Sequence, residues 1–427
     1  MGLAREIEAL IAAGTLRPGE RLPSIRQIAR AVNVSPPLVS RAVAELRRRG
    51  LVQTRARQSV HVAERPPVVR PDADTLPVGL RDAASGNPDP RLLPALQPAI
   101  AALDVTPGLY GDPPELDELM DVARVTLEGH GIDATSLMVT GGAIDAIDRA
   151  LQIHLRAGDT VAVEDPSYSG VLDLLRSRGL ALAPVPIDDE GLNPERLAGA
   201  LAGGAKAVIS TSRANNPFGS AVSESRCREL RTILAGVPAC LVIEDDHAGP
   251  IAGADLHTLT EGRERWVYIQ STAKWLGPDL RVALVAGDRS TIAQARGRQA
   301  LAPGWISHIL QQLVAYQLTS DEALAAIASA EAEYTRRREL LIRALALCNI
   351  SAHGRSGLNV WIPVPDEARV VQAAAATGWA IAAGQRFRIA SPPAVRITTG
   401  LLDPSDLEAI AGNLATWFRT PPSGRRA

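Results

Sequence analysis

Six short apolar runs in the chain from residue 137 onward constrain the fold most strongly. They are LMVTGGA (137–143), TVAVEDP (160–166), AVISTS (207–212), CLVIEDD (240–246), WVYIQST (266–272) and VALVAGD (282–288). The apolar residues are continuous rather than alternating, as in strands that are buried on both faces. The spacers are long enough for crossover helices. The pattern therefore predicts an α/β fold with a mostly parallel, doubly wound sheet.

Polar residues gather where these runs end. They are Gly141–Gly142, Asp165–Tyr168, Asn215–Asn216, Asp245–His247 and Ser271–Lys274. Open α/β sheets bind ligands at the edge formed by the carboxyl ends of their strands. Each group alone has an ordinary explanation as a turn, a strand exit or a surface charge. Five of them at one edge favour a binding site.

Lys274 is the most informative residue of this set. The chain contains only two lysines among its 45 Lys and Arg residues, so arginine supplies nearly every other positive charge. The second lysine, Lys206, precedes an apolar run and is typical of a surface residue. An amine at the edge of a sheet can condense with an aldehyde. We therefore expect Lys274 to be the reactive residue of the site.

An aldehyde carried on a pyridine ring would explain the neighbouring polar residues. A carboxylate favours a protonated ring nitrogen, and two unit charges 4 Å apart attract by about 4 kcal/mol at an effective dielectric of 20. Asp245 is placed for this role, and Asp246 is the alternative because spacing does not fix the side-chain direction. Asn216 and His247 could hydrogen-bond the phenolic oxygen of the ring, and Tyr168 could pack on its face. His247 could also be a packed histidine without a role in binding.

The remaining residues at this edge suit a phosphate group, which is bound by helix-start N–H groups, hydroxyls and arginine. The residues that offer these groups are Ala143 and Ile144 after the glycine turn, the hydroxyls of Ser271 and Thr272, and Arg281.

Residues 80–418 resemble the fold-type I aminotransferases. The matching strings are YGDPPELDEL, EDPSYSG, NNPFG, IEDDH, STAKWLGPDLR, GLNVWIPVP and VRIT. The resemblance implies a large domain that binds pyridoxal 5′-phosphate, with a smaller C-terminal α+β subdomain. It implies that Lys274 supplies the amine that binds the cofactor and that Arg396 binds the carboxylate of the substrate. It also implies that Tyr110 contacts the cofactor phosphate of a neighbouring subunit, and therefore that the protein is a homodimer.

Three positions depart from the commoner pattern of that family. His247 replaces a tyrosine, Phe218 replaces a threonine, and Ala273 replaces a serine before the lysine. The histidine changes the donor to the ring oxygen. We expect the cofactor to bind in spite of this change, whereas efficient amino-group transfer is less favoured.

The first 65 residues differ in charge from the rest of the chain. They carry 12 Arg against 5 Asp and Glu, a net charge of +7, whereas the remainder carries −9. Apolar residues at helical spacing predict three helices, the second with the positions Ile25, Ile28, Ala29 and Val32. Ser24 and Ser35 are candidate N-caps, and Pro36 suits a first helical position. Two short β runs follow, Leu51–Thr54 and Val60–Val62.

This arrangement predicts a winged helix-turn-helix that meets a polyanion. A protein-interaction module with a solvated basic face is the alternative. The residues expected to contact double-stranded DNA are Ser24, Arg26, Ser35, Leu38, Ser40, Arg41, Arg55 and Arg57. The string GTLRPGERLPSIRQIARAVNVSPPLVSRAVAELRRRGLV resembles the N-terminal domain of GntR-type bacterial repressors.

A GntR-type head on an aminotransferase-like body resembles the MocR subfamily of regulators. We predict a head over residues 1–64, a linker over 65–79 and a body over 80–427. The expected function is a DNA-binding regulator that senses pyridoxal phosphate or an amino compound. The alternative is an active aminotransferase with an accessory head.

Composition excludes several other classes. Cys227, Cys240 and Cys348 lie far apart without metal-ligand spacing, which predicts neither a disulfide framework nor a metal site. The apolar runs are too short to span a membrane. Together with a charged N-terminal helix, these features predict a cytoplasmic, nucleoid-associated protein.

Overall fold

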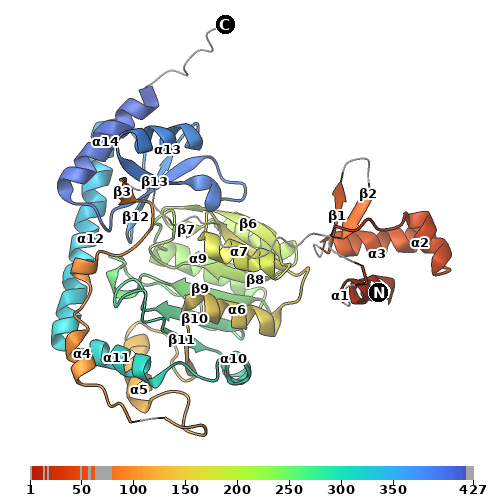
Figure 1. Ribbon diagram of the computed structural model, residues 1–427, viewed down its shortest axis with the longest axis horizontal. Helices are drawn as coiled ribbons and strands as arrows, with labels where there is room; N and C mark the ends of the chain where they lie inside the picture. Colours follow the sequence, from red (N-terminus) through yellow and green to blue (C-terminus); the bar gives the residue numbers. More distant parts are fainter. Residues whose placement is uncertain are drawn as a thin grey trace.

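The computed structural model describes residues 2–12, 15–16, 19–48, 51–55, 59–62, 79–106 and 108–419. The head has the predicted three helices and hairpin (Figure 1). These are α1 (Gly2–Ala12), α2 (Ile25–Ala31), α3 (Pro36–Arg48), β1 (Val52–Arg55) and β2 (Ser59–Val62). The two strands pair antiparallel, with Val52 opposite Val62. The apolar side chains of these helices and strands form a separate core of the head around Ile7, Val39 and Leu46.

Local sequence sets the start of both helices of the helix-turn-helix. The Ser24 hydroxyl accepts a hydrogen bond from the Gln27 N–H, and the Gln27 side chain accepts from the Ser24 N–H at 2.8 Å, which is a complete capping box. Pro36 stands at the first position of α3. The carbonyl of Ser35, which precedes it, accepts hydrogen bonds from the N–H groups of Leu38 and Val39. The predicted apolar stripe of α2 is buried only in its middle. Ile25, the first residue of this seven-residue helix, and Val32, its C-cap, remain exposed.

The body contains an eight-stranded sheet in the order β4-β11-β10-β9-β8-β5-β6-β7. The strands are β4 (Leu137–Thr140), β5 (Thr160–Asp165), β6 (Ala181–Asp188), β7 (Gly191–Leu192), β8 (Ala205–Ser210), β9 (Leu241–Asp246), β10 (Trp266–Ser271) and β11 (Ala283–Gly287). The five strands from β10 to β6 are parallel, which confirms the prediction of a mostly parallel sheet. β11 runs antiparallel to both of its neighbours, β10 and β4.

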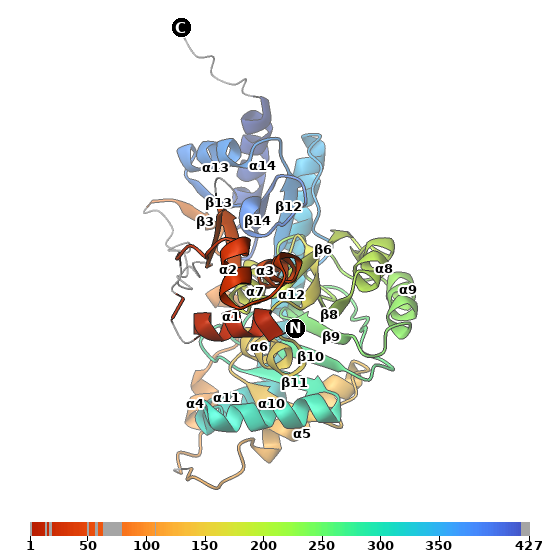
Figure 2. The ribbon, with the colours of Figure 1, turned by 90° about the vertical axis from the view of Figure 1, so that its right-hand side faces the viewer.

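Helices cover both faces of this sheet, as the views in Figures 1 and 2 show. One face packs on α6 (Ala143–His154), α7 (Ser169–Ser177) and α10 (Arg289–Leu301). The other packs on α5 (Asp117–Gly129), α8 (Pro194–Ala202), α9 (Glu224–Ala235), α11 (His308–Thr319) and the start of α12 (Asp321–Leu347). Short elements complete this part of the chain: α4 (Gln97–Ala101), η2 (Pro90–Leu92) and η3 (Gly249–Ile251). The sheet is therefore buried on both faces, which explains the continuous apolar runs.

A smaller sheet, in the order β12-β14-β13-β3, packs on α13 (Glu367–Ala376), α14 (Pro404–Arg419) and the end of α12. Its strands are β12 (Asn359–Pro363), β13 (Trp379–Ala383) and β14 (Ala394–Thr398), with η4 (Gly384–Arg386) after β13. The fourth strand, β3 (Arg81–Ala83), comes from the other end of the body and pairs parallel with β13. The predicted C-terminal α+β subdomain is thus completed by residues that come before the large sheet.

The predicted linker lies outside the described residues except for Gly79. In the described ranges, no helix is both long and apolar enough to cross a membrane. The same residues contain no group of three or more His, Cys, Asp or Glu side chains that could hold a metal ion.

Candidate functional site

Lys274 lies in a tight turn directly after β10. The Thr272 carbonyl accepts hydrogen bonds from the backbone N–H groups of Trp275 and Leu276, which fixes this turn. The Lys274 Nζ donates to the backbone carbonyl of Gly86 at 2.6 Å. Burial, together with the nearby Arg396 cation, lowers the pKa of Lys274 from 10.5 to about 8. At neutral pH the uncharged form of this amine is therefore far more populated than in an ordinary lysine.

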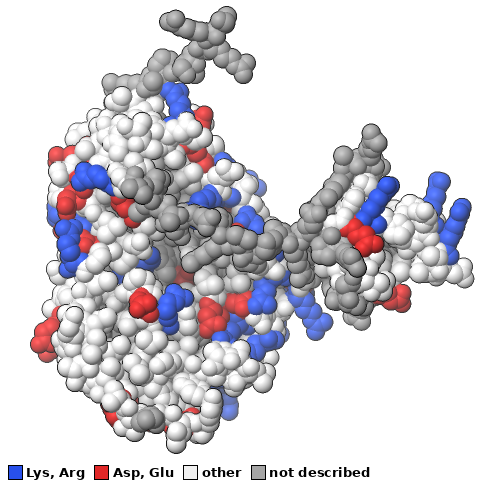
Figure 3. Space-filling model, viewed as in Figure 1, with Lys and Arg blue, Asp and Glu red and all other residues white. Residues whose placement is uncertain are grey.

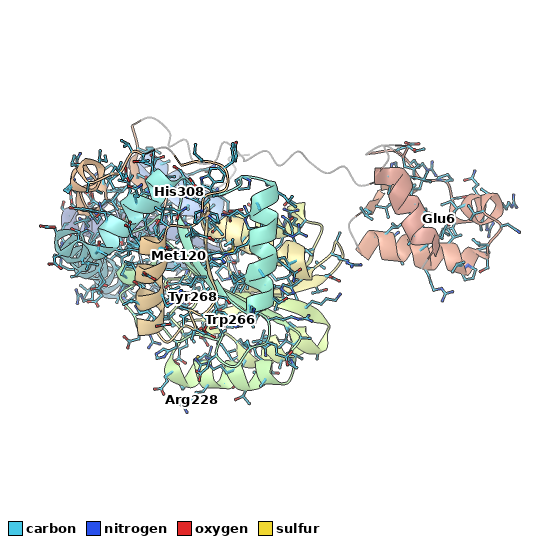
Figure 4. The ribbon with its side chains drawn as sticks, turned by 90° about the horizontal axis from the view of Figure 1, so that it is seen from below. Glu6, Met120, Arg228, Trp266, Tyr268 and His308 are labelled. Atoms are coloured by element: carbon cyan, nitrogen blue, oxygen red, sulfur yellow. The ribbon has the colours of Figure 1, made fainter. Side chains whose placement is uncertain are left out.

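The structure separates the roles of the two adjacent aspartates on β9. Successive residues of a strand point to opposite faces. The Asp246 carboxylate accepts two bonds from Arg213, at 2.9 and 3.1 Å, and one from the Tyr268 hydroxyl at 2.7 Å. Burial opposes its ionisation, but Arg213 outweighs this effect and keeps the pKa of Asp246 below its usual value. Tyr268 is fully buried on β10 (Figure 4), so Asp246 belongs to an internal network.

Asp245 has a different environment. Its side chain is 5% exposed, and its Oδ1 atom has no hydrogen-bond partner among the described residues. Burial and the neighbouring Asp246 charge raise the pKa of Asp245 to about 7. A buried, unpartnered acceptor is costly unless a ligand supplies the missing donor. A protonated pyridine nitrogen would supply that donor, so of the two aspartates we assign this role to Asp245.

His247, Asn216 and Tyr168, which were expected around the pyridine ring, follow the ends of three different strands, β9, β8 and β5. Burial and the Lys274 charge lower the pKa of His247 to about 4, so its ring is neutral and carries a single N–H donor. The Asn216 Oδ1 atom accepts from Arg396 at 2.8 Å. Tyr168, at the start of α7, is 38% exposed, and its ring lies against the Gly170 backbone.

The start of α6 offers the predicted phosphate site. Gly142 precedes the helix with φ of +111° and supplies no side-chain cap, so the first N–H groups, those of Ala143 and Ile144, face outward from the helix end. The Arg281 guanidinium donates to the Gly141 carbonyl at 2.9 Å. The φ of +111° at Gly142 is one that a residue with a Cβ rarely adopts, which explains the glycine.

The two hydroxyl residues of the site differ. The Ser271 Oγ atom accepts a long bond of 3.4 Å from the Ala273 N–H and keeps its own hydrogen for a ligand. The Thr272 hydroxyl donates to the Val282 carbonyl at 2.8 Å and is fully buried. Thr272 therefore stabilises the turn that carries Lys274, and its hydrogen is already used.

Arg396 lies on β14 of the smaller sheet and reaches toward the large one. Its guanidinium stacks on the Phe387 ring, 4.7 Å from the centroid, and donates to Asn216 and to the Ala84 carbonyl. A Cβ on Gly86 would lie 3.5 Å from the same guanidinium. Lys274 and Arg396 thus lie close enough together for one small ligand to meet both.

Tyr110 makes its described contact with a residue outside this set. It is 94% exposed and contacts Trp305 edge to face, with 5.6 Å between ring centroids. Val105, Leu109 and Leu301 are other large apolar residues that are exposed in these neighbouring segments. The placement is compatible with the predicted contact to a second subunit.

Sequence reasoning gave no role to four residues that hold the site in shape, although it placed Asp165 and Asn215 at this sheet edge. Glu164 is buried, accepts from the Asn215 amide at 2.5 Å and has its pKa raised to about 7 by burial. Asn215 in turn accepts from the Phe218 N–H and fixes the turn that presents Asn216. Arg213 neutralises Asp246. The carboxylate of Asp165 accepts from three successive N–H groups, those of residues 389–391. The EDP and SRANNPFG strings were the available signals.

The head presents most of its predicted DNA contacts to solvent. Ser24, Arg26, Ser35, Ser40 and Arg41 are exposed, and Leu38 is half-buried. The side chain of Arg55 and the whole of Arg57 lie outside the described residues. Figure 3 shows blue side chains projecting from the head, whereas blue and red are interspersed over the visible face of the body.

Comparison with known proteins decides the family. The family model described as "Bacterial regulatory proteins, gntR family" matches residues 2–62, and the model described as "Aminotransferase class I and II" matches residues 85–414. The vitamin B6 salvage pathway transcriptional repressor PtsJ of Salmonella typhimurium is 37% identical over 407 residues, which cover 95% of each chain. The chain belongs to the MocR subfamily of GntR-type regulators.

Other MocR-like relatives and solved structures agree. The HTH-type transcriptional regulator TauR of Rhodobacter capsulatus is 27% identical, over 83% of this chain and 82% of its own. The kynurenine aminotransferase of Pyrococcus horikoshii has the same body fold, with a TM-score of 0.73 at 20% identity, over 80% of this chain and 91% of its own. The predicted MocR architecture is confirmed. The family match, and the fit of Asp245, Lys274 and the start of α6, support pyridoxal phosphate as the cofactor of this member.

Proposed function

We propose that this MocR protein is a transcriptional regulator whose head binds operator DNA and whose body binds pyridoxal phosphate and reports its presence. The observation that carries the proposal is the buried, unpartnered Oδ1 atom of Asp245, at the same sheet edge as the Lys274 amine with its lowered pKa. A sheet edge that brings an amine and a buried carboxylate together is suited to bind an aldehyde carried on a basic ring.

Each residue of the site has a definite task. The cofactor, when bound, supplies an aldehyde and an electron-withdrawing pyridinium ring. Lys274 supplies the uncharged amine that captures it. Asp245 holds the proton at the ring nitrogen, and the α6 start with Arg281 and Ser271 binds the phosphate. His247 donates one hydrogen bond to the phenolic oxygen, and Tyr168 covers the ring.

We infer that the sensed compound is vitamin B6 itself, in the form of pyridoxal phosphate, or an amino compound that reacts with it. The 37% identity to a vitamin B6 salvage repressor over nearly the whole chain supports the first choice. Arg396 supports a carboxylate on the second kind of ligand, because a guanidinium binds carboxylates with two parallel hydrogen bonds.

The DNA-bound form is proposed to be a homodimer in the cytoplasm, associated with the nucleoid. The exposed Tyr110 and its apolar neighbours support a subunit contact. A two-fold pair of heads would read half-sites on one face of the duplex, at a spacing near a multiple of about 10 bp. Direct repeats in the operator would instead indicate an offset arrangement of the heads.

The test combines absorbance with footprinting. We expect the purified protein to bind pyridoxal phosphate with a near-visible band that Lys274→Ala removes. Lys206→Ala is the matched control, because it removes the only other lysine, which pairs with Asp159 on the surface. Footprinting on the protein's own upstream region, with and without pyridoxal phosphate, should reveal an operator whose occupancy changes. A band that persists in Lys274→Ala, or an unchanged footprint, would contradict the proposal.

Amino-group transfer is a second candidate function, because Lys274 and Arg396 are both in place. The neutral His247 argues for slow transfer, since it replaces the tyrosine that is common in active relatives. Incubation with an L-amino acid and a 2-oxo acid measures this directly. A multiple-turnover reaction that His247→Tyr accelerates would support residual enzyme activity, whereas no product in either protein would restrict the body to sensing.

A further inference from the structure

One short backbone segment accepts hydrogen bonds from two of the cations of the site, Lys274 and Arg396. We call residues 84–87, between β3 and η2, the strap. The Lys274 Nζ donates to the Gly86 carbonyl at 2.6 Å, and the Arg396 Nη2 donates to the Ala84 carbonyl. The amine expected to capture an aldehyde and the guanidinium expected to bind a carboxylate therefore both donate to carbonyls of these four residues.

The strap has a defined shape that aims these carbonyls. The Asp82 carboxylate accepts from the N–H groups of Ala84 and Ser85, at 2.9 and 2.8 Å, and from the Ser85 hydroxyl. The Ser85 Oγ accepts from the Asn87 N–H at 3.2 Å. Gly86 has φ of +74°, which a residue with a Cβ rarely adopts. A loose loop would have none of these restraints, so the two contacts are a built feature of the chain.

The strap also joins the smaller sheet to the larger one. It continues from β3, which pairs with β13 and is anchored by Arg81, whose guanidinium lies 4.5 Å above the Trp379 ring and pairs with Asp406. Lys274 belongs to the turn after β10 of the large sheet. The bond from Lys274 to Gly86, like the bond from Arg396 to Asn216, therefore spans the two sheets.

The position of β3 in the chain links these hydrogen bonds to the segment that leads to the head. β3 begins at Arg81, two residues after the end of the predicted linker at 79. Any shift of the smaller sheet relative to the large one moves the point at which the linker joins the body. The head and the site are thus connected through the strand that precedes the strap.

We propose that the strap is a latch: it holds Lys274 and Arg396 in the empty protein, and the cofactor and a carboxylate ligand each displace one of its bonds and so free the edge strand that receives the linker. The proposal rests on the proposed function, because it explains how a ligand in the body changes the head.

The chemistry of Lys274 and of Arg396 explains why a ligand would replace the strap carbonyl at each of them. On capture of an aldehyde, the uncharged amine of Lys274 forms a double bond to the aldehyde carbon. Its two hydrogens leave with the aldehyde oxygen as water, so it no longer donates to Gly86. Arg396 must turn two parallel N–H groups toward a carboxylate, and this charged acceptor binds more strongly than the neutral carbonyl of Ala84. The two bonds are lost one after the other, first to the cofactor and then to the ligand.

Hydrogen exchange with mass spectrometry tests the first part on the full chain. The probes are pyridoxal phosphate alone and N-(5′-phosphopyridoxyl)-L-alanine, which carries the ring, the phosphate and a carboxylate but cannot condense with Lys274. We expect exchange in the peptide that contains residues 84–89 to rise at least 3-fold with either probe. Exchange in the β9 segment should not rise. Unchanged or slower exchange in the strap with both probes, while absorbance shows that pyridoxal phosphate is bound, would overturn the latch.

Asp82→Ala tests the link to the head, because it loosens the strap without touching the ligand. Asp133→Ala is the matched control, since Asp133 caps the N–H and hydroxyl of Thr135 in the same way at a remote turn. Operator affinity is measured by fluorescence anisotropy with and without pyridoxal phosphate. Typical couplings between sites correspond to changes of about 5–150-fold. We expect such a change in the wild type and in Asp133→Ala, and less than 2-fold in Asp82→Ala.

The outcomes separate this inference from the proposed function. If pyridoxal phosphate gives no lysine-dependent band, or if it leaves operator affinity of the wild type unchanged, the proposed function fails and the latch fails with it. If wild type and Asp82→Ala respond equally while both bind the cofactor, only the latch is refuted. The cofactor band in Asp82→Ala also shows that this variant is folded.

Discussion

Replacing Asp245 by asparagine should stabilise the empty protein and weaken its hold on the cofactor. The folded state raises the pKa of Asp245 from 3.8 to about 7. Between these pH values the unfolded chain has already released the proton that folded Asp245 keeps, so the wild type loses stability as pH rises through this window. At 1.36 kcal/mol per pKa unit, the loss reaches about 4 kcal/mol above pH 7. Asparagine has no such proton and avoids the loss.

The effect is large enough to measure by thermal unfolding. An unfolding entropy of about 2.1 cal/mol/K per residue, taken over a body of roughly 340 residues, converts 4 kcal/mol into a rise of roughly 6 °C in the midpoint. We expect this rise for cofactor-free Asp245→Asn at pH 8 and little change at pH 4. With pyridoxal phosphate the order reverses. Loss of an attraction of about 4 kcal/mol, partly replaced by a neutral hydrogen bond, should weaken binding about 100-fold.

Asp246→Asn is the matched control, one residue along the same strand. It leaves the buried Arg213 without its counter-charge, and breaking a buried ion pair in this way costs about 3–5 kcal/mol. Its midpoint should therefore fall at pH 8. The assignment is refuted if Asp245→Asn lowers the midpoint of the empty protein, or if Asp246→Asn abolishes cofactor binding while unfolding at the wild-type temperature.

Four further outcomes are expected. The rate of pyridoxal phosphate capture, followed by near-visible absorbance, should rise with pH and level off above about pH 8, because only the uncharged Lys274 amine reacts; a flat profile between pH 6 and 8 would contradict the pKa. Ser24→Ala removes a capping box worth about 1 kcal/mol, so amides of α2 should exchange about 5-fold faster. Arg41→Ala should weaken operator binding more than binding to random DNA in a titration, whereas Arg57→Ala should weaken both alike; equal losses for Arg41→Ala would argue against base readout. Tyr110→Ala subunits mixed with Lys274→Ala subunits should regain about a quarter of the wild-type cofactor band, since one site of each mixed dimer is intact; no recovery would exclude a shared site.

Sequence patterns predicted the layers of the body because burial on both faces leaves a direct signal in composition. The antiparallel direction of β11 left no such signal, since an apolar run reads the same in either direction. The edge strand β3 was also missed, because three residues are too few for any periodicity. Both features concern how segments pair, which depends on contacts between distant parts of the chain.

Residue types indicated which residues are candidates for the site, but they did not fix the directions of the side chains. Lys274 was the first candidate because lysine is so rare in this chain. The choice between Asp245 and Asp246 required the coordinates, because Arg213 lies 33 residues away in sequence. The Thr272 hydroxyl proved to be used by Val282, and the strap was invisible, since backbone carbonyls at Ala84 and Gly86 have no signature in amino-acid type.

The alternation along β9 limits how this chain can change during evolution. Deleting one residue from the strand upstream of the two acids would rotate them by half a turn. Asp246 would then take the place of Asp245, Asp245 would take the place of Glu244 beside Ser212 and Thr258, and His247 would be left against Arg213. Every apolar neighbour on the strand would also turn to the wrong layer. Insertions and deletions should therefore accumulate in the loops of homologues, while the six residues of β9 keep a fixed length even where their identities drift.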